Sequence, residues 1–283
     1  MSAPRQCLGY ARRRSAHGRL RSAAAITVVT VLGIGFGAKA SPSSSSAIRL
    51  DDPSDLVRAY PAELSKIVNG VLIWRDGVRM PIATERPDRP YQERLDRPGI
   101  ADMFSIPYRL GPPPGPPAVD DDPGRIRYEP FFRKMYGDCA KGEVSAKLRR
   151  VAWMPSRGGG FVEITTVNGV DKQLQAVVRE LEALPPSMTR YLVPSGGTYD
   201  CRAVAGTDRR SMHAYGAAID ISTRTADYWL WKKPKGSGPI PYRNQIPYQI
   251  VQIFERHGFI WGGKWYHYDT MHFEYRPELL PGD

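Results

Sequence analysis

Two short motifs, far apart in the chain, put ionisable side chains inside otherwise apolar runs. In "SMHAYGAAID", His213 and Asp220 stand seven positions apart, separated mainly by small residues. In "DTMHFEY", His272 lies in a strand-like run, with Asp269 three residues before it. Burying such groups costs free energy unless something pairs with them. The chain must therefore fold so that these side chains find common partners.

Strand alternation gives each motif a polar face. In "AAIDI" it turns Asp220 to the face opposite its two isoleucine neighbours, and in "MHFEY" it turns His272 and Glu274 to one face. A single histidine–aspartate pair is most often a hydrogen-bonded core pair without an ion. The second histidine favours a metal, because two histidines and one carboxylate are a ligand set typical of catalytic zinc. We expect Ser211 and Tyr215 to orient these ligands.

The rest of the pattern predicts an α+β fold. Alternation predicts strands at residues 161–167, 199–204, 218–222, 259–263 and 271–276, a hairpin over 71–82, and helices over 171–184 and 247–258. Strands interleaved with two helices, without regular βαβ repeats, indicate a compact domain with a mainly antiparallel sheet flanked by helices.

The N-terminal part divides into segments of different composition. Residues 1–40 combine a basic start, an apolar run and a small-x-small pattern ending at Ala40, which predicts a signal peptide. The alternative is an uncleaved anchor, but the apolar run is short for a span of roughly 20 residues. Residues 41–127 read as an extension with a serine-rich spacer and a proline-rich strap at 111–124, and residues 128–283 as one compact domain.

Charge and cysteine content agree with export. The net charge is +11, but residues 1–40 hold seven basic residues and no acidic one, so the excess lies mostly in the leader. This distribution argues against a nucleic-acid-binding face. Cys7 leaves with the leader, and Cys139 and Cys201 remain. We expect them to form a disulfide in a periplasmic or extracellular location, the alternative being two buried thiols.

The motif Ser-x-His-x-x-Gly-x-Ala-x-Asp, followed by Asp-x-x-His, resembles a known family over residues 199–274, including "GFIWGGKW". It is similar to the VanY-type zinc D,D-carboxypeptidases and L-alanyl-D-glutamate endopeptidases, which act on peptidoglycan. The resemblance implies that residues 128–283 form a zinc peptidase domain whose antiparallel sheet carries the metal. It implies that His213, Asp220 and His272 bind Zn²⁺, that Asp269 is the catalytic acid/base, and that Arg202 grips a substrate carboxylate. Many members have glutamate where this chain has Asp269; aspartate is similar to the endopeptidase-like branch.

Several alternatives stay open at this point. Glu274 and His267 are fallback bases, and Arg209 or Arg210 could replace Arg202. The expected function is hydrolysis of an amide bond in peptidoglycan stem peptides, at either D-Ala-D-Ala or L-Ala-D-Glu. A catalytically silent zinc module that binds the cell wall is the alternative. We expect a monomer that binds no nucleic acid and meets a membrane only through an uncleaved leader.

Overall fold

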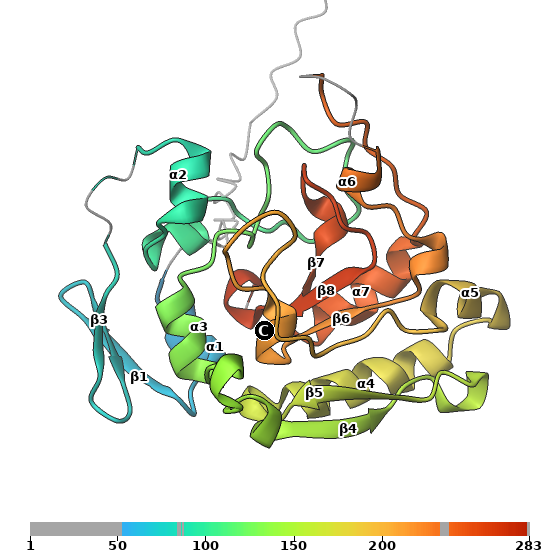
Figure 1. Ribbon diagram of the computed structural model, residues 1–283, viewed down its shortest axis with the longest axis horizontal. Helices are drawn as coiled ribbons and strands as arrows, with labels where there is room; N and C mark the ends of the chain where they lie inside the picture. The colour runs from blue at the N-terminus through green and yellow to red at the C-terminus, as the bar shows by residue number, and fades with distance from the viewer. Residues whose placement is uncertain (1–52, 84–85, 87, 233–237, 282–283) are drawn as a thin grey trace, which may run out of the picture. The chain divides into compact units, whose positions relative to one another are not determined.

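Small antiparallel sheets and two amphipathic helices organise the part of the chain that the structure describes (Figure 1). The structure, a computed structural model, describes residues 53–281 except 84–85, 87 and 233–237. The predicted signal peptide and serine-rich spacer lie outside the described residues. Among the described helices, none is both long and apolar enough to cross a membrane. The predicted α+β class with antiparallel sheets is confirmed.

The sheet that carries both motifs has β8 (His272–Tyr275) between β6 (Ala218–Asp220) and β7 (Phe259–Trp261). Both pairings are antiparallel. The register sets Asp220 directly opposite His272. The two motifs therefore meet because their strands are neighbours in one sheet.

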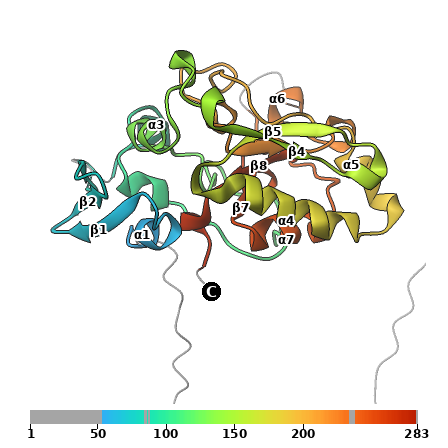
Figure 2. The same ribbon diagram turned by 90° about the horizontal axis from the view of Figure 1, so that it is seen from below.

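The helix α7 (Tyr248–Arg256) packs its apolar side on this sheet. Its Phe254 is fully buried and stacks on Phe273 of β8, with ring centroids 3.9 Å apart. Helix α4 (Val170–Glu182) contacts α7 and covers the hairpin of β4 (Leu148–Ala152) and β5 (Phe161–Thr165), an arrangement visible in Figure 2. These elements match the helices and the strand predicted from periodicity.

Strand β5 also contacts the first motif. The amide of Thr165 at the end of β5 donates to the carbonyl of Gly216, 2.9 Å away. Gly216 has φ +63, and a Cβ there would lie 2.7 Å from Leu148. Glycine is thus required at this point of the motif, since a side chain would face both a strained backbone and a collision.

The N-terminal segment shares the core of the rest of the chain. The predicted hairpin is confirmed as β2 (Val71–Trp74) and β3 (Arg79–Pro81), joined on its other edge by β1 (Leu64–Val68). Shorter helices accompany it: α1 (Asp55–Ala59), α2 (Tyr91–Asp96) and α3 (Glu129–Tyr136). Phe131 of α3 packs against Trp74, and the Tyr60 hydroxyl donates to Glu278, 2.6 Å away. The boundary at residues 127 and 128 stays a prediction, because shared contacts do not show whether either part folds alone.

Two predictions about connecting segments have clear outcomes. The strap at 111–124 contains neither helix nor strand, as its prolines predict. The strand predicted at 199–204 is wrong: the segment turns back on itself, and only Ala203 forms a bridge, with Arg210. No neighbouring strand pairs with it within the described chain, and the predicted disulfide ties Cys201 to Cys139 across 5.7 Å between Cα atoms. The remaining helices, α5 (Thr189–Leu192) and α6 (Trp229–Lys232), are short.

Candidate metal centre

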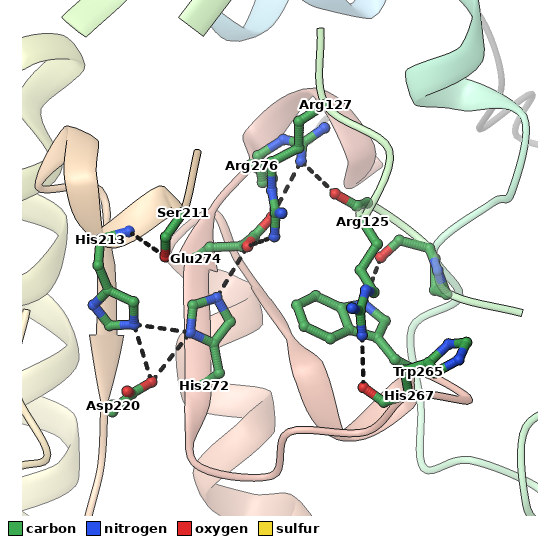
Figure 3. A network of polar contacts seen from close by, with 12 residues as sticks. Arg125, Arg127, Ser211, His213, Asp220, Trp265, His267, His272, Glu274 and Arg276 are labelled. Carbon is green, nitrogen blue, oxygen red and sulfur yellow. Dashed lines mark hydrogen bonds and ion pairs between the residues drawn. The ribbon is translucent and has the colours of Figure 1, made fainter. Parts of the chain in front are cut away.

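Three side chains from separate elements converge at the end of the β6–β8 pair (Figure 3). His213 comes from a 3₁₀ turn that Ser211 caps by accepting the amide hydrogen of His213. Asp220 ends β6 and His272 begins β8. The Oδ1 atom of Asp220 lies 3.2 Å from Nε2 of His213 and 3.1 Å from Nδ1 of His272, and these two nitrogens are 3.1 Å apart. This group could hold a metal ion.

In each histidine, the partner of the ring nitrogen that faces away from Asp220 fixes the tautomer. Nδ1 of His213 lies against the carbonyl oxygen of Thr198, which can only accept, so this nitrogen carries the hydrogen. Nε2 of His272 donates to Oε2 of Glu274, 3.0 Å away. Each ring therefore turns an unprotonated nitrogen toward Asp220, as metal-binding histidines do.

This donor set fits a divalent cation. Two nitrogen lone pairs and a carboxylate oxygen, each about 3 Å from the others, repel one another unless a positive charge lies between them. Both histidines are less than 10% exposed, with His213 at 4% and His272 at 7%. Burial opposes ionisation of Asp220, but positive charge on the two neighbouring imidazoles outweighs it and holds the pKa of Asp220 well below its usual value; a bound cation would supply that charge when both rings are neutral.

Sequence reasoning missed both partners that orient the rings. We expected Ser211 and Tyr215 to orient the ligands, but Ser211 caps the turn, and Thr198 and Glu274 orient the rings. The Thr198 carbonyl is in place because the preceding residue, Gly197, accepts a hydrogen bond from the amide of Asp220, 2.8 Å away. A sequence pattern does not indicate which backbone carbonyl will contact a side chain, whereas the alternation of "MHFEY" already placed Glu274 on the same face as His272.

Asp269 lies in the same cavity as the three converging side chains. Its amide donates to Gly262, 3.0 Å away, and its carbonyl accepts from the amide of His272, 3.2 Å away, so a backbone turn fixes its position. Its Oδ1 atom is buried and has no hydrogen-bond partner among the described residues. Burial and the charge of Asp220 raise the pKa of Asp269 to about 6. Because Asp269 lines the cavity, its carboxyl group can accept a proton from a group that enters it.

The cavity, of about 250 Å³, has a strongly cationic wall. Arg202 and its alternative Arg209 both line it, but Arg202 pairs with Asp200 at 3.0 Å and Arg209 with Asp96 at 2.6 Å. The other alternative, Arg210, is not among the residues that line this cavity; it lines an adjoining one.

The remaining lining arginines, Arg125 and Arg127, were missed. They follow the proline-rich strap, and the sequence gives no sign that this segment reaches the centre.

The two fallback bases are both occupied by other partners. Glu274 is fully buried and accepts from Arg127 and Arg276 as well as from His272. Nδ1 of His267 lies 2.6 Å from a carboxylate oxygen of Asp122. Neither residue lines the cavity. Asp269 is thus the candidate base that the geometry favours.

Comparison with known proteins agrees with the two motifs. Residues 205–275 match a family model described as D-alanyl-D-alanine carboxypeptidase. The matched segment holds the three converging side chains and Asp269, whereas Arg125, Arg127 and Arg202 lie outside it. Searches of curated proteins and of solved structures found no match. The resemblance of the two motifs to the D-alanyl-D-alanine carboxypeptidase family is thus confirmed over residues 205–275.

Proposed function

We propose that this chain is an exported zinc metallopeptidase that hydrolyses an amide bond in peptidoglycan stem peptides. The observation that carries the proposal is the convergence of two oriented imidazoles and a carboxylate beside an unpartnered oxygen of Asp269. His213, Asp220 and His272 hold the Zn²⁺ ion. Bound zinc supplies a Lewis acid that lowers the pKa of water and polarises a carbonyl group.

Asp269 moves the proton in the proposed reaction. Its carboxylate, which lines the cavity, accepts a proton from the attacking water and then gives that proton to the leaving amine. Burial raises the pKa of Asp269 above its usual value, toward the range in which a carboxyl group can both accept and donate a proton. Arg202 binds a substrate carboxylate, for which the planar guanidinium group is suited.

The proposal includes two candidates for the scissile bond. A terminal D-Ala-D-Ala bond agrees with the description of the matched family model, and an internal L-Ala-D-Glu bond agrees with aspartate as the base. Mass analysis of the fragment released from purified sacculi separates the two. The cysteine pair is consistent with an oxidising compartment, where disulfides persist.

Digestion of sacculi by the chain that begins at Ser41 tests the proposal. We expect hydrolysis with Zn²⁺, none with a chelator, and none for Asp269→Asn, which should keep its metal. Asp88→Asn, at an exposed position, removes the same charge and should remain active. A Zn²⁺-loaded wild type that binds sacculi without cleaving them would favour the silent binding module, and full activity of Asp269→Asn would reject Asp269 as the base.

A further inference from the structure

Arg125 differs from the other arginines of the cavity because it forms no ion pair with a carboxylate among the described residues. Arg127, Arg202 and Arg209 each pair with a carboxylate. Within the described chain Arg125 forms no ion pair; its side-chain bond runs from Nη1 to the carbonyl oxygen of His267, 2.9 Å away. The carboxylates of Asp122 and Asp269 interact with Arg125 through their charge but form no ion pair with it, so a ligand carboxylate would supply the direct contact that both lack.

Arg125 lies between two neighbouring cavities and lines both. It lines the cavity of the metal centre and also the adjoining cavity that Arg210 lines. Its guanidinium carbon lies 5.5 Å from the ring centroid of Trp265, and Trp265 in turn lies beside His272, with 5.6 Å between ring centroids. Figure 3 shows the Arg125 side chain against Trp265, on the side of His272 away from His213. Arg125 is therefore a cationic neighbour of the metal centre.

The backbone around Arg125 is fixed by hydrogen bonds to the second motif region. Trp265 donates from Nε1 to the carbonyl of Pro123, and Arg276 donates from Nη1 to the carbonyl of Gly124, each at 2.7 Å. Gly124 has φ +85, and a Cβ there would lie 2.4 Å from Cδ1 of Ile260, so only glycine allows this close approach. These contacts fix the backbone beside Arg125, and the bond from Nη1 to His267 holds the guanidinium group before a ligand arrives, which lowers the entropy cost of binding.

We propose that Arg125 binds a carboxylate of the substrate, different from the one that Arg202 holds, and so determines specificity for peptides with two acidic groups. This inference rests on the proposed function for the identity of the substrate. A stem peptide carries several free carboxylates, and a guanidinium fork can bind one of them through two parallel hydrogen bonds. Because Arg125 lies outside residues 205–275, this specificity comes from the segment that follows the proline-rich strap.

Acid and amide forms of one stem peptide provide the test. Each substrate pair consists of the free acid and one amide: in the first pair the internal glutamyl carboxylate is amidated, and in the second the C-terminal carboxylate. Both pairs are compared in wild type, Arg125→Met, Arg202→Met and the control Arg79→Met. Methionine keeps the apolar packing on Trp265 and removes the charge, and Arg79 is an exposed arginine of β3. The readouts are kcat/KM and the dissociation constant from calorimetry.

The wild type should favour the acid over the amide by about 10- to 100-fold, the range for a hydrogen bond to a charged group. For one pair, Arg125→Met should bring this ratio close to one by lowering kcat/KM for the acid far more than for the amide. It should leave the acid-to-amide ratio of the pair sensitive to Arg202→Met unchanged. Unchanged ratios in Arg125→Met, or loss at the same pair in both variants, would overturn the inference. If no peptide is cleaved but the acid still binds in an Arg125-dependent way, the proposed function fails and this inference stands.

Discussion

Replacement of Glu274 by glutamine should weaken metal binding without touching a proposed ligand. Glu274 is fully buried, accepts from Nε2 of His272 at 3.0 Å, and pairs with Arg127 and Arg276. Burial opposes its ionisation, but Arg127, His272 and Arg276 together hold the pKa of Glu274 far below its usual value. Glu274 is therefore ionised in the fold and orients His272 by its charge.

The contacts of Glu274 predict the size of the loss in metal affinity and of the loss in stability. Loss of a partner that orients a metal-binding histidine typically costs 10- to 100-fold in metal affinity, so we expect about that loss for Zn²⁺. Neutralising one member of a buried ion-pair network typically costs about 3–5 kcal/mol in the free energy of unfolding. Glu278 offers a matched control, because it is equally buried and pairs with Arg276 at 2.5 Å but does not contact His272.

Competition with a chromophoric chelator measures the affinity for Zn²⁺, and urea unfolding of the chelated protein measures stability. Glu274→Gln should lower both quantities, whereas Glu278→Gln should lower stability alone. Unchanged Zn²⁺ affinity in Glu274→Gln would refute the reasoning. So would an equal loss of affinity in Glu278→Gln, since the effect would then follow from general destabilisation.

Other predictions concern what holds the fold around the centre. Gly124→Ala should lower the melting temperature and catalytic efficiency, because the added Cβ meets Ile260 at 2.4 Å; wild-type values for both would contradict the tight approach. Replacing Cys139 and Cys201 by serine should cost about 4 kcal/mol in the free energy of unfolding, from the 62-residue separation that the bridge closes, as measured by urea titration against oxidised wild type; reduced wild type should match the variant. Phe254→Ala should lower the free energy of unfolding by about 3–5 kcal/mol in the same assay, since the ring is fully buried between α7 and the central sheet. A loss below about 1 kcal/mol would mean that neighbouring side chains move in to fill the space left by the ring.

Much of the centre could be predicted because its signals are local. The three converging side chains and Asp269 sit in two motifs whose alternation already gives each side chain a face. The helices were equally readable, because Leu174 and Phe254 belong to apolar stripes with a period of 3.6 residues. The disulfide followed from the number of cysteines and the expected compartment.

What could not be predicted depends on contacts between distant segments. The segment at 199–204 has the alternation of a strand, but the sequence does not say that no partner strand lies beside it. Arg125 and Arg127 reach the centre only because the strap folds back onto Trp265 and Arg276. The Thr198 carbonyl orients His213 through backbone geometry, to which the side-chain identity at that position gives no clue.

The metal content of the purified protein tests the central claim most directly. Wild type and single variants His213→Ala, Asp220→Ala, His272→Ala and Asp269→Asn are dialysed against dilute Zn²⁺ and analysed for metal and protein. We predict one tightly bound ion per chain in the wild type and in Asp269→Asn, and loss of that ion in each of the three ligand variants. A wild type that binds no ion, or ligand variants that all keep it, would contradict the account.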